Sequence, residues 1–138
     1  MKLLLVSHGT FATGLFESYV MIAGVNSDIS AICLTDEGVG DFSKRLQDFV
    51  KMHVNDGLLI LCDIKGGTPF NEAYREFLAN PQQVKVVTGM NLPMLIETGV
   101  ALQNGGKFEE LVELAVNTGR TSIEGTEVLE EQEDEIDF

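Results

Sequence analysis

Two side chains whose types and positions suit chemistry follow short apolar runs in this chain, where strands are expected to end. His8 follows the run that begins at Leu3, and Asp63 follows a second run that begins at Leu58. A carboxylate that accepts a hydrogen bond from Nδ1–H of an imidazole leaves the lone pair of Nε2 pointing outward. An unperturbed imidazole is mostly neutral near pH 7, so such a nitrogen is nucleophilic without a large pKa change. The pair therefore indicates a nucleophilic His8 oriented by Asp63.

Glycines follow both side chains and precede segments with helical periodicity. Gly9 comes before one such segment and Gly67 before another. Free backbone N–H groups at helix starts bind anions. A nucleophilic nitrogen that faces an anion site suits phosphoryl transfer, where positioning and charge stabilisation supply most of the catalysis. Taken singly, the same residues are also compatible with strand-to-helix turns around a structural histidine.

The other histidine and the two cysteines are expected to be structural. His53 lies near the end of a predicted helix, where the helix dipole favours an imidazole. Cys33 and Cys62 end apolar runs and are expected to be buried free thiols. Two cysteines without close histidine or cysteine partners do not make a zinc site. We therefore expect no metal and no cofactor.

Strand-like and helix-like segments alternate along the chain. The predicted strands cover residues 2–7, 29–34, 58–62 and 84–87, and the predicted helices cover 11–23, 39–54, 68–79, 92–102 and 108–116. This alternation predicts an α/β fold, a doubly wound, four-stranded parallel sheet of order 2-1-3-4 with helices on both faces. Helix N-caps are predicted at Thr10, Thr68 and Asn91, with Pro69 at the first position of its helix.

This strand order places the first and third strands side by side. LLLVSH, residues 3–8, can be written above LLILCD, residues 58–63. In parallel neighbours, residues at matching positions are close enough for a side-chain hydrogen bond. Ligands of such sheets bind beyond the carboxyl ends of the strands, where the strand order reverses. His8 and Asp63 are therefore expected to end level with each other at that edge.

The charge of the chain argues against nucleic acid as a partner. The formal net charge is −13, and residues Glu127 to Phe138 contain seven acids and no base. A nucleic-acid phosphate backbone requires clustered Lys and Arg. The apolar run from Leu3 to Val6 is too short for an export signal or a membrane span. We expect no direct membrane insertion and a cytoplasmic location.

Three motifs together resemble the mannose-type (mannose/fructose/sorbose) enzyme IIA family of the sugar phosphotransferase system. The motifs are Ser7-His8-Gly9-Thr10-Phe11-Ala12 with Gly14-Leu15, then Asp63 followed by Gly66-Gly67-Thr68-Pro69-Phe70-Asn71, and finally Gly89-Met90-Asn91-Leu92-Pro93-Met94-Leu95-Ile96-Glu97. Their order and their spread over most of the chain make the resemblance specific.

The resemblance implies a histidine phosphocarrier. It would accept a phosphoryl group from the phosphocarrier HPr on Nε2 of His8 and donate it to a histidine of an enzyme IIB component for sugar uptake. Asp63 takes the place of the aspartate that orients the family's histidine, and Thr68 that of a Ser or Thr that bonds the phosphoryl oxygens. The residues expected to bind the phosphoryl group are Gly9, Thr10, Gly67 and Thr68.

The resemblance also implies an assembly. The family's parallel sheet is extended by an antiparallel strand that is exchanged in a homodimer. The candidate strand here is 121–129, although Gly125 interrupts it. Residues 1–129 would then be one phosphocarrier domain and residues 130–138 an acidic tail. Because the match ends at this tail, the IIB component is expected to be a separate protein.

Four other functions share part of this sequence pattern or fold. The phosphoryl-donor subunit of dihydroxyacetone kinase has a similar fold and histidine, although its second motif resembles Met-Gly-Ser. A non-catalytic module on the same fold would bind an anion reversibly and form no phosphohistidine. A response-regulator receiver needs paired acids after its first strand, where this chain has Ser7 and His8. A metal hydrolase would need more ligands than the strand ends offer.

Overall fold

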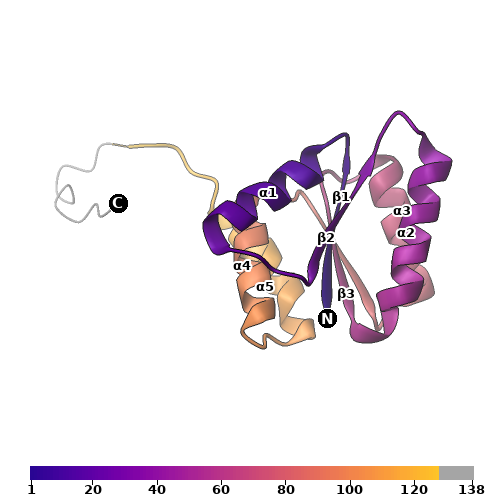
Figure 1. Ribbon diagram of the computed structural model, residues 1–138. Coiled ribbons are helices and arrows are strands. Elements are labelled where there is room, and N and C mark those ends of the chain that lie inside the picture. The colour runs from indigo at the N-terminus through magenta and orange to yellow at the C-terminus, as the bar shows by residue number, and fades with distance from the viewer. Residues whose placement is uncertain (128–138) are drawn as a thin grey trace.

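A parallel sheet between two layers of helices organises residues 1–127, the part of the 138-residue chain that this computed structural model describes (Figure 1). The strands are β1 (Lys2–His8), β2 (Ile29–Leu34), β3 (Leu58–Cys62) and β4 (Val84–Thr88). The helices are α1 (Phe11–Ala23), α2 (Val39–His53), α3 (Gly67–Ala79), α4 (Leu92–Gln103) and α5 (Phe108–Thr121), and a 3-10 turn (Val54–Asp56) follows α2.

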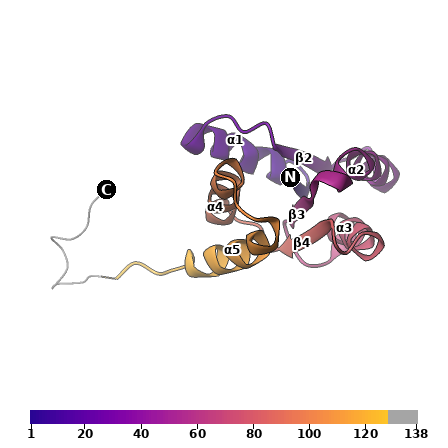
Figure 2. The same cartoon turned by 90° about the horizontal axis from the view of Figure 1, so that it is seen from below.

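The sheet has the order β2-β1-β3-β4, and all of its neighbouring strands are parallel, which confirms the predicted fold. β3 lies inside the sheet, and all five of its residues are buried. Its unbroken run of Leu, Ile and Cys is typical of a strand that is covered on both faces. Figure 2 shows α1, α4 and α5 on one face of the sheet and α2 with α3 on the other.

The alternation of side chains along β1 distributes its residues between two hydrophobic clusters. Leu3 and Leu5 belong to the cluster with α1, α4 and α5, whereas Leu4 and Val6 belong to the cluster with α2 and α3. Successive side chains of a strand point to opposite faces. The same alternation directs the next residue, Ser7, toward the α1 side of the sheet and His8 toward the α3 side.

The register between β1 and β3 differs by one residue from the predicted alignment. Lys2 pairs with Leu58 and Val6 with Cys62, so the residue level with Asp63 is Ser7 rather than His8. The backbone N–H of Asp63 donates to the carbonyl of Val6 at 3.2 Å. Parallel ladder hydrogen bonds are slanted along the strands. The offset therefore still leaves the His8 and Asp63 side chains within reach of each other.

Only one of the three predicted N-caps uses its side chain. Asn91 accepts the N–H of Met94 at 3.0 Å. Thr10 stands at the N-cap of α1 without a side-chain hydrogen bond. Thr68 lies inside α3, whose N-cap is Gly66, so that Pro69 is the third residue of α3 and not the first. Helix α3 begins at Gly67, one residue before its predicted start.

The C-terminal segment differs from its predicted form. Helix α5 continues to Thr121, beyond the predicted end at residue 116, and residues 122–127 form neither helix nor strand. A lone strand gains little stability without a partner edge, so strand exchange stays a prediction. Positions 128–129 and the predicted acidic tail, 130–138, lie outside the described residues. Within residues 1–127, no helix is long and apolar enough to cross a membrane.

The packing of α1 against α4 leads to a stability prediction. A Cβ at Gly99 of α4 would lie 2.6 Å from Cε2 of Tyr19, a fully buried side chain of α1. Gly99→Ala should therefore lower the free energy of unfolding by about 1–3 kcal/mol in urea denaturation, because Tyr19 has no room to move.

Gly14→Ala is the matched control, because a Cβ at this α1 position meets nothing within 4 Å. Alanine favours helix over glycine, so this variant should be neutral or more stable by up to about 1 kcal/mol. Equal losses in the two variants would contradict the described contact between α1 and α4.

Candidate functional site

His8 and Asp63 meet at the carboxyl ends of β1 and β3. Nδ1 of His8 lies 2.9 Å from Oδ2 of Asp63, and the same oxygen accepts the backbone N–H of His8 at 2.9 Å. Oδ1 of Asp63 accepts the N–H of Ile64 at 2.9 Å. The His8 side chain is 45% exposed and the Asp63 side chain 13%. The backbone thus fixes the carboxylate, which holds the ring by Nδ1 while the ring stays open to solvent.

The hydrogen bonds determine the charge state of Asp63. Burial alone, the largest single influence, raises its pKa. Hydrogen bonds from the backbone and ring of His8 and from the N–H of Ile64, together with the charge of His8, outweigh burial, so the pKa of Asp63 lies below its ordinary value of 3.8. At neutral pH the group is a carboxylate, an acceptor that keeps the proton of a neutral His8 on Nδ1.

Gly67, the first residue of α3, lies in front of the other ring nitrogen. Its φ is +80°, and a Cβ there would lie 2.9 Å from Nε2 and 3.0 Å from Cε1 of His8. Glycine is therefore favoured both by the backbone conformation and by the close approach of the ring. The first-turn N–H groups of α3 have no acceptor inside the helix, so Nε2 faces a helix N-terminus.

The remaining predicted phosphoryl-binding residues are Gly9 and Thr10, which precede α1, and Thr68, in the first turn of α3. They differ in which of their groups are free to bind an anion. The N–H of Gly9 donates to the carbonyl of Leu34 at 2.8 Å and is not free for an anion. With φ of +57°, Gly9 contributes a backbone turn instead. Thr10 is exposed at the start of α1, and Thr68 is half-buried in the first turn of α3.

Ser7 is a residue of this site that sequence reasoning did not single out. Its side chain is fully buried, and Oγ accepts the N–H of Ala12 at 2.8 Å and donates to the carbonyl of Gly9 at 3.1 Å. Ser7 thus caps α1 from the end of β1, which is the role predicted for Thr10. The sequence signal is weak, because a serine that caps from five residues away leaves no recognisable pattern.

The second histidine and the two cysteines do not form another nucleophilic site. His53 ends α2, and its ring packs on Phe49 with centroids 4.5 Å apart. Cys33 and Cys62 are both free, as predicted, but only Cys62 is buried, whereas Cys33 is half-buried. Burial, and secondarily the charge of Asp63, raises the pKa of Cys62 to about 12. Cys62 is therefore a protonated, unreactive thiol at neutral pH.

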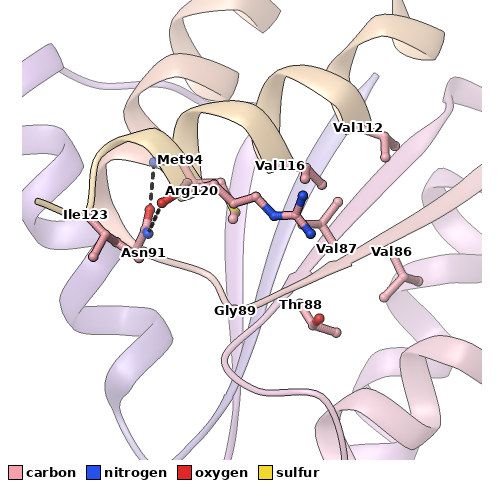
Figure 3. A pocket seen from close by; sticks show the side chains of 11 residues that line it. Val86, Val87, Thr88, Gly89, Asn91, Met94, Val112, Val116, Arg120 and Ile123 are labelled. Atoms are coloured by element: carbon pink, nitrogen blue, oxygen red, sulfur yellow. Dashed lines mark hydrogen bonds between the residues drawn. The ribbon is translucent and has the colours of Figure 1, made fainter.

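A groove of about 380 Å³ lies between α5 and β4, at one edge of the sheet (Figure 3). Its valines come from the strand and the helix, namely Val86, Val87, Val112 and Val116. Figure 3 shows the Arg120 side chain extending from α5 along this groove. None of the predicted site residues lines it.

Comparison with known proteins identifies the family of the chain. The sequence matches the family described as "PTS system fructose IIA component" over residues 2–116. The chain belongs to the mannose-type enzyme IIA family of the sugar phosphotransferase system. The resemblance carried by the three motifs is thereby confirmed.

Relatives of this IIA chain cover most of its length. It is 34% identical over 122 residues to the mannose-specific EIIAB component of Escherichia coli K12, in a match that covers 85% of the chain and 36% of that relative. The chain thus spans about a third of the length of that relative. It is 31% identical over 105 residues to the sorbose-specific EIIA component of Lacticaseibacillus casei, covering 75% of each.

A solved structure agrees with the fold of the IIA chain. The mannose/sorbose-specific IIA subunit from Enterococcus faecalis matches it with a TM-score of 0.83 at 33% identity, covering 94% of this chain and 96% of that one.

The hydrogen bonds to Asp63 predict how the IIA chain responds to acid. Since the folded pKa is below the ordinary value of 3.8, the stabilising contribution of this carboxylate is present above that pH and is lost as the pH falls through the folded value. NMR titration of the Asp63 carboxyl carbon should therefore give a pKa below 3.8. In His8→Ala the pKa should rise, because one donor is removed. A wild-type pKa at or above the ordinary value would contradict the hydrogen-bond network.

Proposed function

We propose that this protein is a phosphocarrier of a phosphoenolpyruvate-dependent sugar phosphotransferase system. It accepts a phosphoryl group from HPr on Nε2 of His8 and donates it to an enzyme IIB component. The observation that carries the proposal is the arrangement of the His8 ring, with Nδ1 bound by Asp63 and Nε2 facing Gly67. Membership of the IIA family supports the same chemistry.

The transfer balances without a further proton acceptor. The lone pair of Nε2 forms the new bond to phosphorus while the bond between phosphorus and the donor breaks, and its electron pair stays on the donor. His8 keeps its Nδ1 proton and becomes a positively charged phosphoimidazolium. The Asp63 carboxylate, 2.9 Å from Nδ1, faces this developing charge and stabilises it. In donation to IIB, the bond between Nε2 and phosphorus breaks, its electron pair returns to Nε2, and a nucleophile of IIB forms the new bond to phosphorus.

Backbone N–H groups at the starts of α1 and α3 would bind the phosphoryl oxygens. The N-termini of α1 and α3 both open from the loops that carry His8 and Asp63, and free N–H groups with the helix dipole stabilise negative charge there. Gly67 and Thr68 contribute from α3 and Thr10 from α1. Gly9 acts through its turn, because its N–H is bonded to Leu34.

Exposed apolar side chains beside His8 fit a surface on which other phosphocarriers dock. Phe11, the first residue of α1, is 49% exposed, and Ile64, in the loop between β3 and α3, is 56% exposed. Docking there would exclude water from the ring during transfer, which strengthens the electrostatic contacts.

The first functional prediction concerns the residue that carries the label. With phosphoenolpyruvate, enzyme I and HPr, the protein should gain one phosphoryl group per chain in an acid-labile, base-stable linkage. His8→Ala should abolish labelling. His53→Ala is the matched control and should label as the wild type does, because His53 packs on Phe49 at the end of α2. Absence of wild-type labelling, or a label on His53, would overturn the proposed function.

We also propose a homodimer built by exchange of the segment 121–129. β4 is at the edge of the sheet, and the groove beside it runs between that edge and α5. Ile123, which lines the groove, belongs to the segment that would pair with the partner's edge. An exposed edge strand is otherwise open to non-specific pairing, and a two-fold exchange would cover the β4 edge of each protomer equally.

Sedimentation tests this assembly. The full chain should sediment as a dimer at micromolar concentration. A chain that ends at Leu129 keeps the exchanged segment and should also be a dimer, whereas a chain that ends at Ser122 lacks the segment and should be a monomer. A monomeric full chain, or a dimer of the shortest chain, would contradict the exchange.

A further inference from the structure

The hydroxyl of Ser7 makes its two short hydrogen bonds within the segment that follows β1, and Sγ of Cys33 lies farther away at 3.9 Å. The hydroxyl accepts the N–H of Ala12 at 2.8 Å and donates to the carbonyl of Gly9 at 3.1 Å. The side chain is 0% exposed, so water cannot replace either partner. Ser7 therefore fixes two peptide units, one in the first turn of α1 and the other between Gly9 and Thr10.

The second of these contacts sets the direction of a peptide dipole. In a trans peptide the C=O and N–H groups point in opposite directions. Because the carbonyl of Gly9 points inward to Ser7, the N–H of Thr10 points away from Ser7. This N–H has no acceptor among residues 1–127. Gly9, with φ of +57°, has the conformational freedom to turn this peptide either way.

We propose that Ser7 is a positioning residue that sets the polarity of the phosphoryl site. By holding the Gly9 carbonyl inward, it presents the N–H of Thr10 to the phosphoryl group and keeps a carbonyl dipole from facing it. This inference rests on the proposed transfer to His8 and adds a residue that touches neither the ring nor the phosphoryl group.

The inference predicts a specific loss in Ser7→Ala. The Gly9–Thr10 peptide is then free to rotate, and phosphorylated His8 loses an oriented donor to a charged acceptor. The equilibrium for phosphoryl exchange with HPr should shift toward phosphorylated HPr by about 10-fold. kcat should fall while KM for HPr stays the same, since Ser7 is buried and makes no contact with a partner.

A purely structural role would give a different result. Ser7→Ala also leaves the buried N–H of Ala12 without its acceptor, so the melting temperature should fall by several degrees. The exchange equilibrium is therefore measured well below that temperature, where the variant is folded. Under those conditions a loss of stability alone leaves the equilibrium unchanged.

Two variants serve as matched comparisons. Ser7→Thr keeps the hydroxyl and should restore the exchange equilibrium to within about threefold of wild type. Thr13→Ala removes a hydroxyl from the same first turn, where it contacts Sγ of Cys33 at 3.2 Å and neither Gly9 nor Ala12. Thr13→Ala should leave the equilibrium unchanged.

The outcomes separate this inference from the proposed function. If the wild type is phosphorylated and folded Ser7→Ala has the same exchange equilibrium, the role of Ser7 is wrong and the phosphocarrier stands. An equal loss in Ser7→Thr would also overturn it. If HPr does not label the wild type, labelling is repeated with phosphoramidate, a small chemical donor. A slower reaction of Ser7→Ala then supports the positioning role, and an equal rate refutes it.

Discussion

The hydrogen bond between Nδ1 of His8 and Asp63 is the contact on which the rest of the site depends. Asp63 can make it because two backbone N–H groups, those of His8 and Ile64, hold its carboxylate. Those N–H groups are placed by the pairing of β1 with β3 in the middle of the sheet. The buried core on both faces of that pair thus provides the rigidity that the imidazole needs. Rigid strands would keep the geometry of the site through the proposed addition and removal of a doubly charged group.

The second constraint is space. Glycine at position 67 lets α3 begin directly against the ring, since a Cβ there would lie 2.9 Å from Nε2. The same residue brings the positive end of a helix to Nε2, the nitrogen that we propose as the phosphoryl acceptor. Ser7 performs the complementary task on the α1 side, where it ties the helix start to β1. The start of α3 and the Asp63 carboxylate therefore lie at different nitrogens of one ring, and α1 begins three residues after His8.

Sequence patterns predicted the fold and the central pair because both follow from periodicity and from the unusual residues at strand ends. Sequence patterns could not predict the one-residue register offset between β1 and β3, since two Leu-rich runs align almost equally well in either register. The bonded N–H of Gly9 and the capping by Ser7 were missed for a related reason. Both depend on which backbone group faces which in three dimensions, and residue type does not encode that. The strand exchange predicted for 121–129 involves a second chain, which a single chain cannot display.

The central claim is that Asp63 selects the tautomer of His8 and thereby makes Nε2 the nucleophile. The most direct test is ¹⁵N NMR of the His8 ring at about pH 8, where imidazole is neutral. The account predicts a protonated Nδ1 and an unprotonated Nε2 in the free protein, and a phosphorus–nitrogen coupling to Nε2 after phosphorylation. In Asp63→Asn the tautomer preference should weaken. A proton on Nε2 in the free wild-type protein, or phosphorus on Nδ1, would contradict the account.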